Sequence, residues 1–265
     1  MKVPKRFGLA RVISKRGYCS RSQAAVLIKA NRVTVNGHAA RDPESPVRIP
    51  QDRIAIDGSA LEKAPLVYLA MNKPRGVVTT ASDEKGRATV YGLLDGQTPW
   101  VAPVGRLDKA SEGLLLLTND PEWAARITDP ADHLDKTYHV QVDCVAEDAI
   151  LAKIVEGCAV EDEILRAKTA RLLRHGGKNS WVEIVLDEGK NRQIRRLLEA
   201  VGIEVLRLVR VSIGPLTLGH LRKGEVRPLT QAEKRSLDQA MTRTNRRHSG
   251  ANEGTNRSPR KSPLK

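Results

Sequence analysis

One polar cluster between two apolar stretches holds the residues best suited to chemistry. It begins with Gly-Arg-Leu-Asp at residues 105–108 and ends at Gly113, directly before the four leucines 114–117. Asp108 therefore lies on a turn before a segment that is apolar enough to be a buried strand. A carboxylate held on such a rigid element can act as a nucleophile or a base. A turn aspartate that accepts a backbone N–H would have the same pattern, and the pattern alone slightly favours this structural role.

Other catalytic patterns are missing from the sequence. Neither common glycine-rich phosphate loop occurs, no Ser or Cys lies in a nucleophile elbow, and the six histidines lack the paired spacing of a metal site. Cys19, Cys144 and Cys158 are scattered, which predicts reduced thiols. No apolar run approaches the roughly 18–20 residues of a membrane span, and the N-terminus lacks a secretory pattern. We therefore expect a cytoplasmic protein without membrane association.

The net charge of +14 is concentrated at the two ends of the chain. Residues 1–63 carry +8, residues 64–240 are neutral, and residues 241–265 carry +6. No acidic residue precedes Asp42. Clustered positive charge of this kind favours a polyphosphate partner such as nucleic acid. A solvated basic face without a partner is the alternative.

The first part of the chain, residues 1–62, is predicted to be a compact module of two helices and a small hairpin sheet. Helical spacing covers residues 6–16, and Ser20 can cap a second helix over residues 21–28. Asn31 suits a left-handed residue that ends this helix. A hairpin with an Asn-Gly turn follows at residues 33–37, and residues 53–56 add a strand. The candidate nucleic-acid-binding residues are basic and lie on or beside the helices: Arg6, Arg11, Lys15, Arg16, Arg21, Lys29 and Arg32.

The second part, residues 63–240, is predicted to be an α+β domain with a mainly antiparallel β-sheet. Strands are expected at residues 66–71, 113–118, 137–142, 168–173, 181–186 and 205–213, and helices at 121–127, 147–156 and 192–200. Many strands with few intervening helices do not fit a parallel doubly wound sheet. Residues 241–265 contain almost no apolar residues, so we expect a disordered basic tail.

Four further motifs accompany the cluster around Asp108. They are NKPRG at 72–76, KTY at 136–138, EGKNRQIRR at 188–196, and LRL with the later IG and GE pairs over 206–225. In order and spacing these motifs resemble the RsuA-like family of ribosomal RNA pseudouridine synthases. Residues 1–60 resemble the alpha-L RNA-binding module of the ribosomal-protein-S-four type, with Asn31 where that module usually has Gly. The resemblance implies a mainly antiparallel catalytic domain preceded by a small α/β RNA-binding domain.

The resemblance also implies the chemistry. A uridine already in RNA is cut at its glycosidic bond, its base is rotated, and the base is rejoined to the ribose through carbon 5, without a cofactor or metal. Asp108 matches the catalytic carboxylate, and Arg195 matches the basic partner that keeps it ionised. Tyr138 matches the aromatic residue that stacks on the target base. Arg192 is the second choice for the basic partner, and Arg106 is suited to fill the space that the flipped uridine leaves.

The expected partner is ribosomal RNA or a ribosomal subunit assembly intermediate, bound by a monomer. Lys73 and Arg192 are added to the expected RNA-binding residues. Residues 83–89 and 111–113 look more like members that act on the large subunit, which slightly favours 23S over 16S RNA. One alternative is a noncatalytic RNA-binding or ribosome-assembly protein, although such a protein need not keep Asp108, Tyr138 and Arg195. A methyltransferase is less favoured because no glycine-rich loop for a methyl donor is seen.

Overall fold

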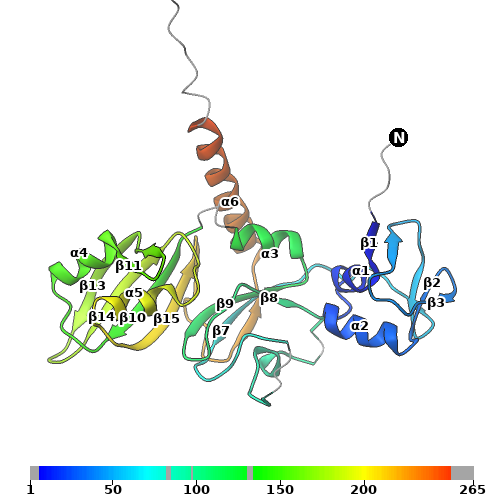
Figure 1. The fold of residues 1–265 in the computed structure, drawn as a ribbon, viewed down its shortest axis with the longest axis horizontal. Coiled ribbons are helices and arrows are strands. Elements are labelled where there is room, and N and C mark those ends of the chain that lie inside the picture. The colour runs from blue at the N-terminus through cyan, green and yellow to red at the C-terminus, as the bar shows by residue number, and fades with distance from the viewer. Residues whose placement is uncertain (1–5, 82–84, 97, 130–133, 252–265) are drawn as a thin grey trace, which may run out of the picture. The chain divides into compact units, whose positions relative to one another are not determined.

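The computed structural model describes residues 6–81, 85–96, 98–129 and 134–251 (Figure 1). Backbone contacts divide the chain into two compact units: residues 1–125 with 218–229, and residues 126–217 with 230–265. This division differs from the predicted domains: the first half of the predicted catalytic domain belongs to the same unit as the N-terminal module. The predicted domain boundary at residue 62 stays a prediction. Within the described part of the chain, no helix combines the length and apolar character that crossing a membrane requires.

The first unit begins with a module of two helices and six short strands. Its elements are β1 (Arg6–Gly8), α1 (Leu9–Lys15), α2 (Arg21–Lys29), β2 (Val33–Val35), β3 (His38–Ala39), β4 (Pro46–Arg48), β5 (Ile54–Ile56) and β6 (Ser59–Ala60). Strands β3-β2-β5-β6 form one antiparallel sheet, and β1 pairs with β4. The prediction of helix from residue 6 is wrong at its start. Residues 6–8 form a strand instead, since pairing with β4 satisfies backbone groups that a free helix end leaves open.

Local signals in this module act as the sequence indicates. The Ser20 hydroxyl accepts from the backbone N–H of Gln23, whose side chain accepts from the Ser20 N–H, which is a complete capping box. Asn31 adopts a left-handed conformation with φ of 58°. Asn36 and Gly37 also have positive φ, as a tight hairpin turn requires. The two helices and the sheet enclose their own apolar core, which includes Ile13 and Ile28.

The rest of the first unit is a small antiparallel sheet. It contains β7 (Tyr68–Lys73), a short 3₁₀ helix η1 (Val90–Leu93), β8 (Ala102–Val104), β9 (Glu112–Thr118) and β17 (Val226–Pro228). Strand β9 pairs with both β7 and β8, and β7 pairs with β17. All seven residues of β9 are buried, which explains the unbroken run of four leucines. Helix α3 (Pro121–Thr128) follows β9 and continues into the second unit.

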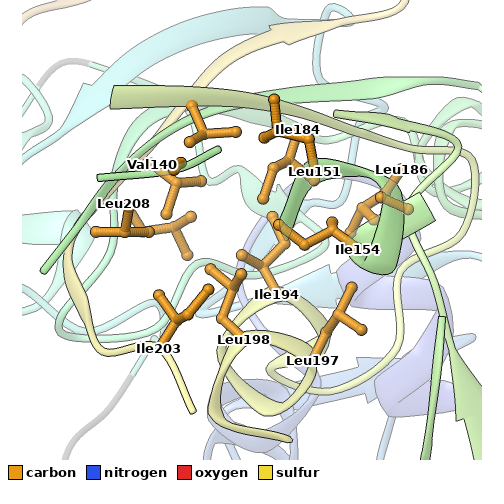
Figure 2. Packing of buried hydrophobic residues seen from close by; sticks show 14 of the residues in the cluster. Val140, Leu151, Ile154, Ile184, Leu186, Ile194, Leu197, Leu198, Ile203 and Leu208 are labelled. Carbon is orange, nitrogen blue, oxygen red and sulfur yellow. The ribbon is translucent and has the colours of Figure 1, made fainter. Parts of the chain in front are cut away.

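The second unit contains a larger antiparallel sheet with two helices on one face, a separate two-stranded sheet, and a third helix. Its strands are β10 (Lys136–Val142), β11 (Cys158–Val160), β12 (Glu163–Leu165), β13 (Thr169–His175), β14 (Ser180–Leu186), β15 (Val205–Ile213) and β16 (Leu216–Thr217), and its helices are α4 (Asp148–Glu156), α5 (Gln193–Ala200) and α6 (Gln231–Ala251). The strand order is β13-β14-β10-β15, with β16 beside β15. Figure 2 shows Val140, Ile184 and Leu208 of the strands directed toward the apolar residues of α4 and α5. The prediction of an α+β fold with a mainly antiparallel sheet is confirmed.

Helix α6 corrects the predicted tail. A second capping box starts it, since Thr230 and Glu233 bond each other's backbone N–H groups. Leu237 and Met241 then anchor it as fully buried residues. The helix continues to Ala251, so the prediction of disorder is wrong for residues 241–251. Extending a nucleated helix adds one hydrogen bond for each residue fixed, even where the residues are polar. Residues 252–265 of the predicted tail lie outside the described residues.

The cysteines are free thiols, as the sequence predicts. Cys19 is buried in the N-terminal module, and burial raises the pKa of its thiol to about 11. At neutral pH this thiol therefore stays protonated and packs as a small apolar group.

Candidate active site

Asp108 lies in the loop that joins β8 to β9, and backbone contacts hold this loop closely. The Asp108 carbonyl accepts from the backbone N–H of Ser111 at 3.0 Å. The Lys109 carbonyl accepts from the N–H of Gly76 at 2.7 Å. The Thr79 hydroxyl donates to the carbonyl of Leu107 at 2.7 Å. The half-buried Asp108 side chain is therefore carried by a backbone that is fixed on both sides of it.

Lys73 lies beneath this loop and corrects one prediction. The register of β7 and β9 places Lys73 opposite Gly113, at the start of the buried strand. Its side chain is fully buried, and Nζ donates to the carbonyls of Ser111, Asp108 and Pro74 at 2.8, 3.0 and 3.2 Å. The expectation that Lys73 binds RNA is therefore wrong, because its ammonium group is enclosed by the loop. Its role is to hold the backbone of Asp108 in place.

The chain returns to this loop much later in the sequence. Glu112 is 3% exposed and forms an ion pair with Lys223 at 3.0 Å. The Asn72 side chain donates to the carbonyl of Leu221 at 2.7 Å, and its backbone N–H donates to the carbonyl of Glu225. Residues 218–229 thus fasten β9, which follows the Asp108 loop, and its neighbour β7.

Arg106 is exposed on the same loop, two residues before Asp108. An exposed guanidinium at this place is available to a nucleic acid that approaches Asp108. The structure therefore brings Arg106, Lys73 and Asp108 together in the first unit.

Tyr138 belongs to the second unit, on β10. It is half-buried and packs against the apolar core beneath α4 and α5. Arg210 on β15 lies directly opposite Tyr138 and is only 6% exposed. The pKa of nearby Lys136 is lowered by burial and by the positive charge of Arg210, against the opposing effect of Asp135 and Asp187. Tyr138 therefore has the nearly buried cation of Arg210 directly opposite it in the sheet.

Sequence reasoning missed Arg210 and Lys136. The signal was present in β15, where Arg210 interrupts an apolar strand at a position whose period places it on the Tyr138 face. A cation in such a position is more informative than one on a helix surface, because a buried charge needs a partner or a role.

The two candidate basic partners lie close together at α5. Arg195 is half-buried, and its guanidinium donates to the carbonyl of Val205 at 3.4 Å. Arg192 is exposed and has a left-handed backbone with φ of 48° where the helix begins. Both line a hollow of about 470 Å³ in the second unit, together with Asp143, Glu199 and Glu204 among others. Because Asp108 is in the first unit, its pairing with Arg195 or Arg192 stays a prediction.

Comparison with known proteins identifies the family. A family model described as RNA pseudouridylate synthase matches residues 67–200, and an S4 domain model matches residues 7–54. The chain is 37% identical over 232 residues to "Ribosomal large subunit pseudouridine synthase B" of Bacillus subtilis, covering 86% of this chain and 94% of that protein. The chain belongs to the RsuA-like family of RNA pseudouridine synthases.

Two further comparisons support the assignment of this chain to the family. An uncharacterized RNA pseudouridine synthase of Aquifex aeolicus is 36% identical and covers 86% of this chain and 92% of its own length. A solved structure titled "Crystal structure of pseudouridylate synthase" has a TM-score of 0.61 and 33% identity, over 87% of this chain and 99% of that chain. The predicted family and the predicted RNA-binding module are thus confirmed.

In the S4 domain of the synthase, some of the predicted RNA-binding residues are exposed, and others form hydrogen bonds or ion pairs within the protein. Arg6, Arg11, Arg21 and Lys29 are exposed. Arg32 instead forms two hydrogen bonds with Asp57, at 2.9 and 2.5 Å, and this pairing lowers the pKa of the Asp57 carboxyl. The Arg16 guanidinium donates to the carbonyl of Leu61 at 2.9 Å, and Lys15 lies 3.7 Å from Glu122. RNA contacts by Arg32, Arg16 and Lys15 stay predictions. Such contacts would compete with the contacts that these side chains make within the synthase.

Among the residues that the structure describes, no group of three or more His, Cys, Asp or Glu side chains could hold a metal ion. The candidate residues are Asp108 with its supporting loop in the first unit and, in the second unit, Tyr138 with its basic neighbours.

Proposed function

We propose that this synthase isomerises one specific uridine of large-subunit ribosomal RNA to pseudouridine. The observation that carries the proposal is the similarity to the Bacillus subtilis enzyme, because it covers 86% of this chain. A Haemophilus influenzae protein of the same name is 38% identical over 217 residues, covering 79% of this chain and 60% of that protein. The residues that favour the large subunit include Asp83 and Glu84, which lie outside the described residues.

The proposed reaction conserves every atom of the RNA. The bond between the ribose and nitrogen 1 of uracil breaks, the base turns, and carbon 5 forms the new bond to the ribose. Carbon 5 then loses its proton, and nitrogen 1 gains one. The isomerisation needs no electron acceptor and transfers no phosphoryl group, so we propose that protein side chains suffice.

Asp108 is proposed to act as the nucleophile or base of this reaction. The fixed position of Asp108 raises the rate, because a carboxylate that is already held in the correct geometry reacts without a separate encounter step. The target uridine must leave its stack to reach Asp108. Tyr138 would receive the flipped base, and exposed Arg106 would occupy the space that the base leaves. The S4 domain would hold the RNA through the exposed charges of Arg6, Arg11, Arg21 and Lys29.

Pseudouridine mapping tests the proposed substrate. Both ribosomal RNAs should be mapped in a strain that lacks the gene, and one site in 23S RNA should lose its modification. A plasmid copy of the synthase should restore this site. Loss of a site in 16S RNA would contradict the choice of subunit. If no site is lost in either RNA, the proposal is wrong and a noncatalytic RNA-binding role is favoured.

Replacing Arg195 by Met should lower turnover and move the acidic limb of the pH–rate profile to higher pH. The change removes the proposed counter-charge of Asp108, which favours the neutral carboxyl over the ionised form. A higher pH is then needed to ionise the same fraction of enzyme. Met keeps much of the aliphatic stem, so α5 should remain packed through Ile194 and Leu198.

Arg192→Met is the matched control for this experiment. Arg192 is exposed, so its loss should weaken RNA binding and leave the acidic limb in place. If Arg192→Met moves the limb and Arg195→Met does not, the basic partner is Arg192.

A further inference from the structure

We propose that the sheet face opposite α4 and α5 in the second unit binds an unpaired segment of RNA, with Trp181 as its stacking surface. The proposal rests on the proposed function only in taking RNA as the substrate. The face lies on β13, β14, β10 and β15 and contains neither Asp108, Tyr138 nor Arg195. Its central feature is the Trp181 row: Arg174, Trp181, Gln141 and Arg207.

Strand register brings these four side chains into one row. Trp181 on β14 lies opposite Gln141 on β10, and Gln141 lies opposite Arg207 on β15. On the other side of Trp181 lies Arg174 of β13. Val182, the next residue of β14, is 1% exposed and belongs to the core beneath the helices. Since successive side chains of a strand alternate between faces, the Trp181 row is on the face away from these helices.

A β-bulge directs Arg174 to this face. Leu172 lies opposite Val182 and Arg174 opposite Trp181, so Leu173 is an extra residue in β13. Without the bulge, Arg174 would lie opposite Ser180, on the same face as buried Val182. Bulges commonly re-aim a side chain at functional sites. Here the bulge places a second guanidinium beside the indole ring.

The row forms a hollow that combines an aromatic ring with two cations. The guanidinium carbons of Arg174 and Arg207 both lie 5.6 Å from the centre of the Trp181 ring. With His139, Leu173 and Val209 they line a hollow of about 430 Å³. Trp181 is half-buried, so its ring is held in place and still accessible.

Arginines outnumber carboxylates in the Trp181 row and in the row beside it, which contains Arg171, Glu183 and His139. The row itself contains two arginines and no carboxylate. Glu183, in the next row, forms a hydrogen bond with Arg171 at 2.6 Å and lies 3.3 Å from the ring nitrogen of His139. The bond with Arg171 is the main reason that the pKa of Glu183 is lowered. The only carboxylate of these two rows is therefore already engaged.

These features fit single-stranded RNA better than a duplex. Unpaired bases stack on aromatic rings and on guanidinium planes, and a base inside a helix cannot. Arginines beside the ring can contact the phosphates on either side of a stacked base. A substrate whose target base must be unstacked offers such unpaired nucleotides close to the reaction site.

The test uses the full-length synthase and a mixed-sequence single-stranded RNA of about 12 nucleotides, the length that one such surface can cover. Trp181→Leu should weaken binding by about fivefold or more, because it removes the stacking surface and keeps an apolar side chain. Trp181→Phe should retain most of the affinity. Arg174→Gln with Arg207→Gln should reduce the slope of log affinity against log salt by about 1.4, for two lost phosphate contacts.

The matched control is Lys153→Gln with Arg166→Gln. Both residues are exposed and belong to the same unit, with Lys153 on α4 and Arg166 beside β12. This double substitution removes two positive charges, as the Arg174 and Arg207 substitutions do. The control should leave affinity and slope nearly unchanged. Ultraviolet crosslinking to the RNA should attach nucleotides to the tryptic peptide 179–190, which contains Trp181. Unchanged affinity and salt slope in the Trp181-row variants, or a crosslink confined to other peptides, would overturn the proposal.

Activity separates this proposal from the proposed function. When the ribosomal RNA concentration is varied, the Trp181-row variants should reach the kcat of the wild type at saturation and show a raised KM. A fall in kcat with KM unchanged would contradict a docking role. If the wild type modifies no ribosomal RNA, the proposed function fails, and the binding and crosslinking results still decide the role of this face.

Discussion

Asp108→Asn should abolish pseudouridine formation and leave RNA affinity unchanged. The amide keeps the size and polarity of the carboxylate, so the loop that holds residue 108 should retain its hydrogen bonds. It cannot act as a nucleophile or accept a proton as a base, and loss of such a group commonly costs roughly 10⁴-fold or more in rate. Tritium release from carbon 5 of labelled uridine would measure the rate, and a filter-binding titration would measure the affinity.

Asp120→Asn provides a control in the same unit. The Asp120 side chain accepts from the Trp123 N–H at 3.1 Å at the start of α3 and from the Tyr68 hydroxyl at 2.8 Å. Asn serves almost equally well as a helix cap, so this variant should remain active. Turnover by Asp108→Asn, with deamidation excluded by mass spectrometry, would show that Asp108 is not the catalytic carboxylate.

Lys73→Met should reduce both stability and rate, although Lys73 does not reach the surface. The variant removes the ammonium donor from the carbonyls of Pro74, Asp108 and Ser111, although the Asp108 carbonyl keeps the backbone N–H of Ser111. Carbonyls that lose a hydrogen-bond donor in the interior destabilise the folded state. The variant also no longer buries a charge, which offsets part of this cost. The free energy of unfolding should therefore fall by about 2–4 kcal/mol. A displacement of Asp108 by about 1 Å could lower kcat by about 100-fold.

Urea denaturation and single-turnover kinetics of the folded protein would measure these two effects. Lys109→Met is the control, because Lys109 is exposed on the same loop and only its backbone carbonyl holds Gly76. It should have nearly the stability and rate of the wild type. A Lys73→Met protein as stable and as active as the control would contradict the role assigned to the buried ammonium.

Features that depend on neighbouring residues were predictable from the sequence. The capping box at Ser20, the left-handed Asn31 and the buried run in β9 each follow from a short pattern whose physical cause is local. The family motifs added Tyr138 and Arg195, which no local pattern distinguishes from a core tyrosine and a helix-surface arginine.

Features that depend on distant segments were not predictable. Residues 6–8 form a strand because β4, about 40 residues later, supplies their hydrogen bonds. Lys73 reads as an exposed turn cation until the register of β7 and β9 places it beneath the Asp108 loop. Arg174 reaches the Trp181 row only through a bulge that alternation along β13 would not predict. In each case the decisive partner lies on another strand.

The return of residues 218–229 to the Asp108 loop has a consequence for biosynthesis. The S4 domain closes its core within the first 61 residues, so it can fold while the rest of the chain is still being translated. The Asp108 loop cannot be completed at that stage. Its fastenings, Lys223 on Glu112 and β17 on β7, emerge from the ribosome more than 100 residues after Asp108. A nascent chain would therefore possess an RNA-binding domain well before it possesses a finished Asp108 loop, and any activity that depends on this loop would begin only after residues 218–229 have emerged.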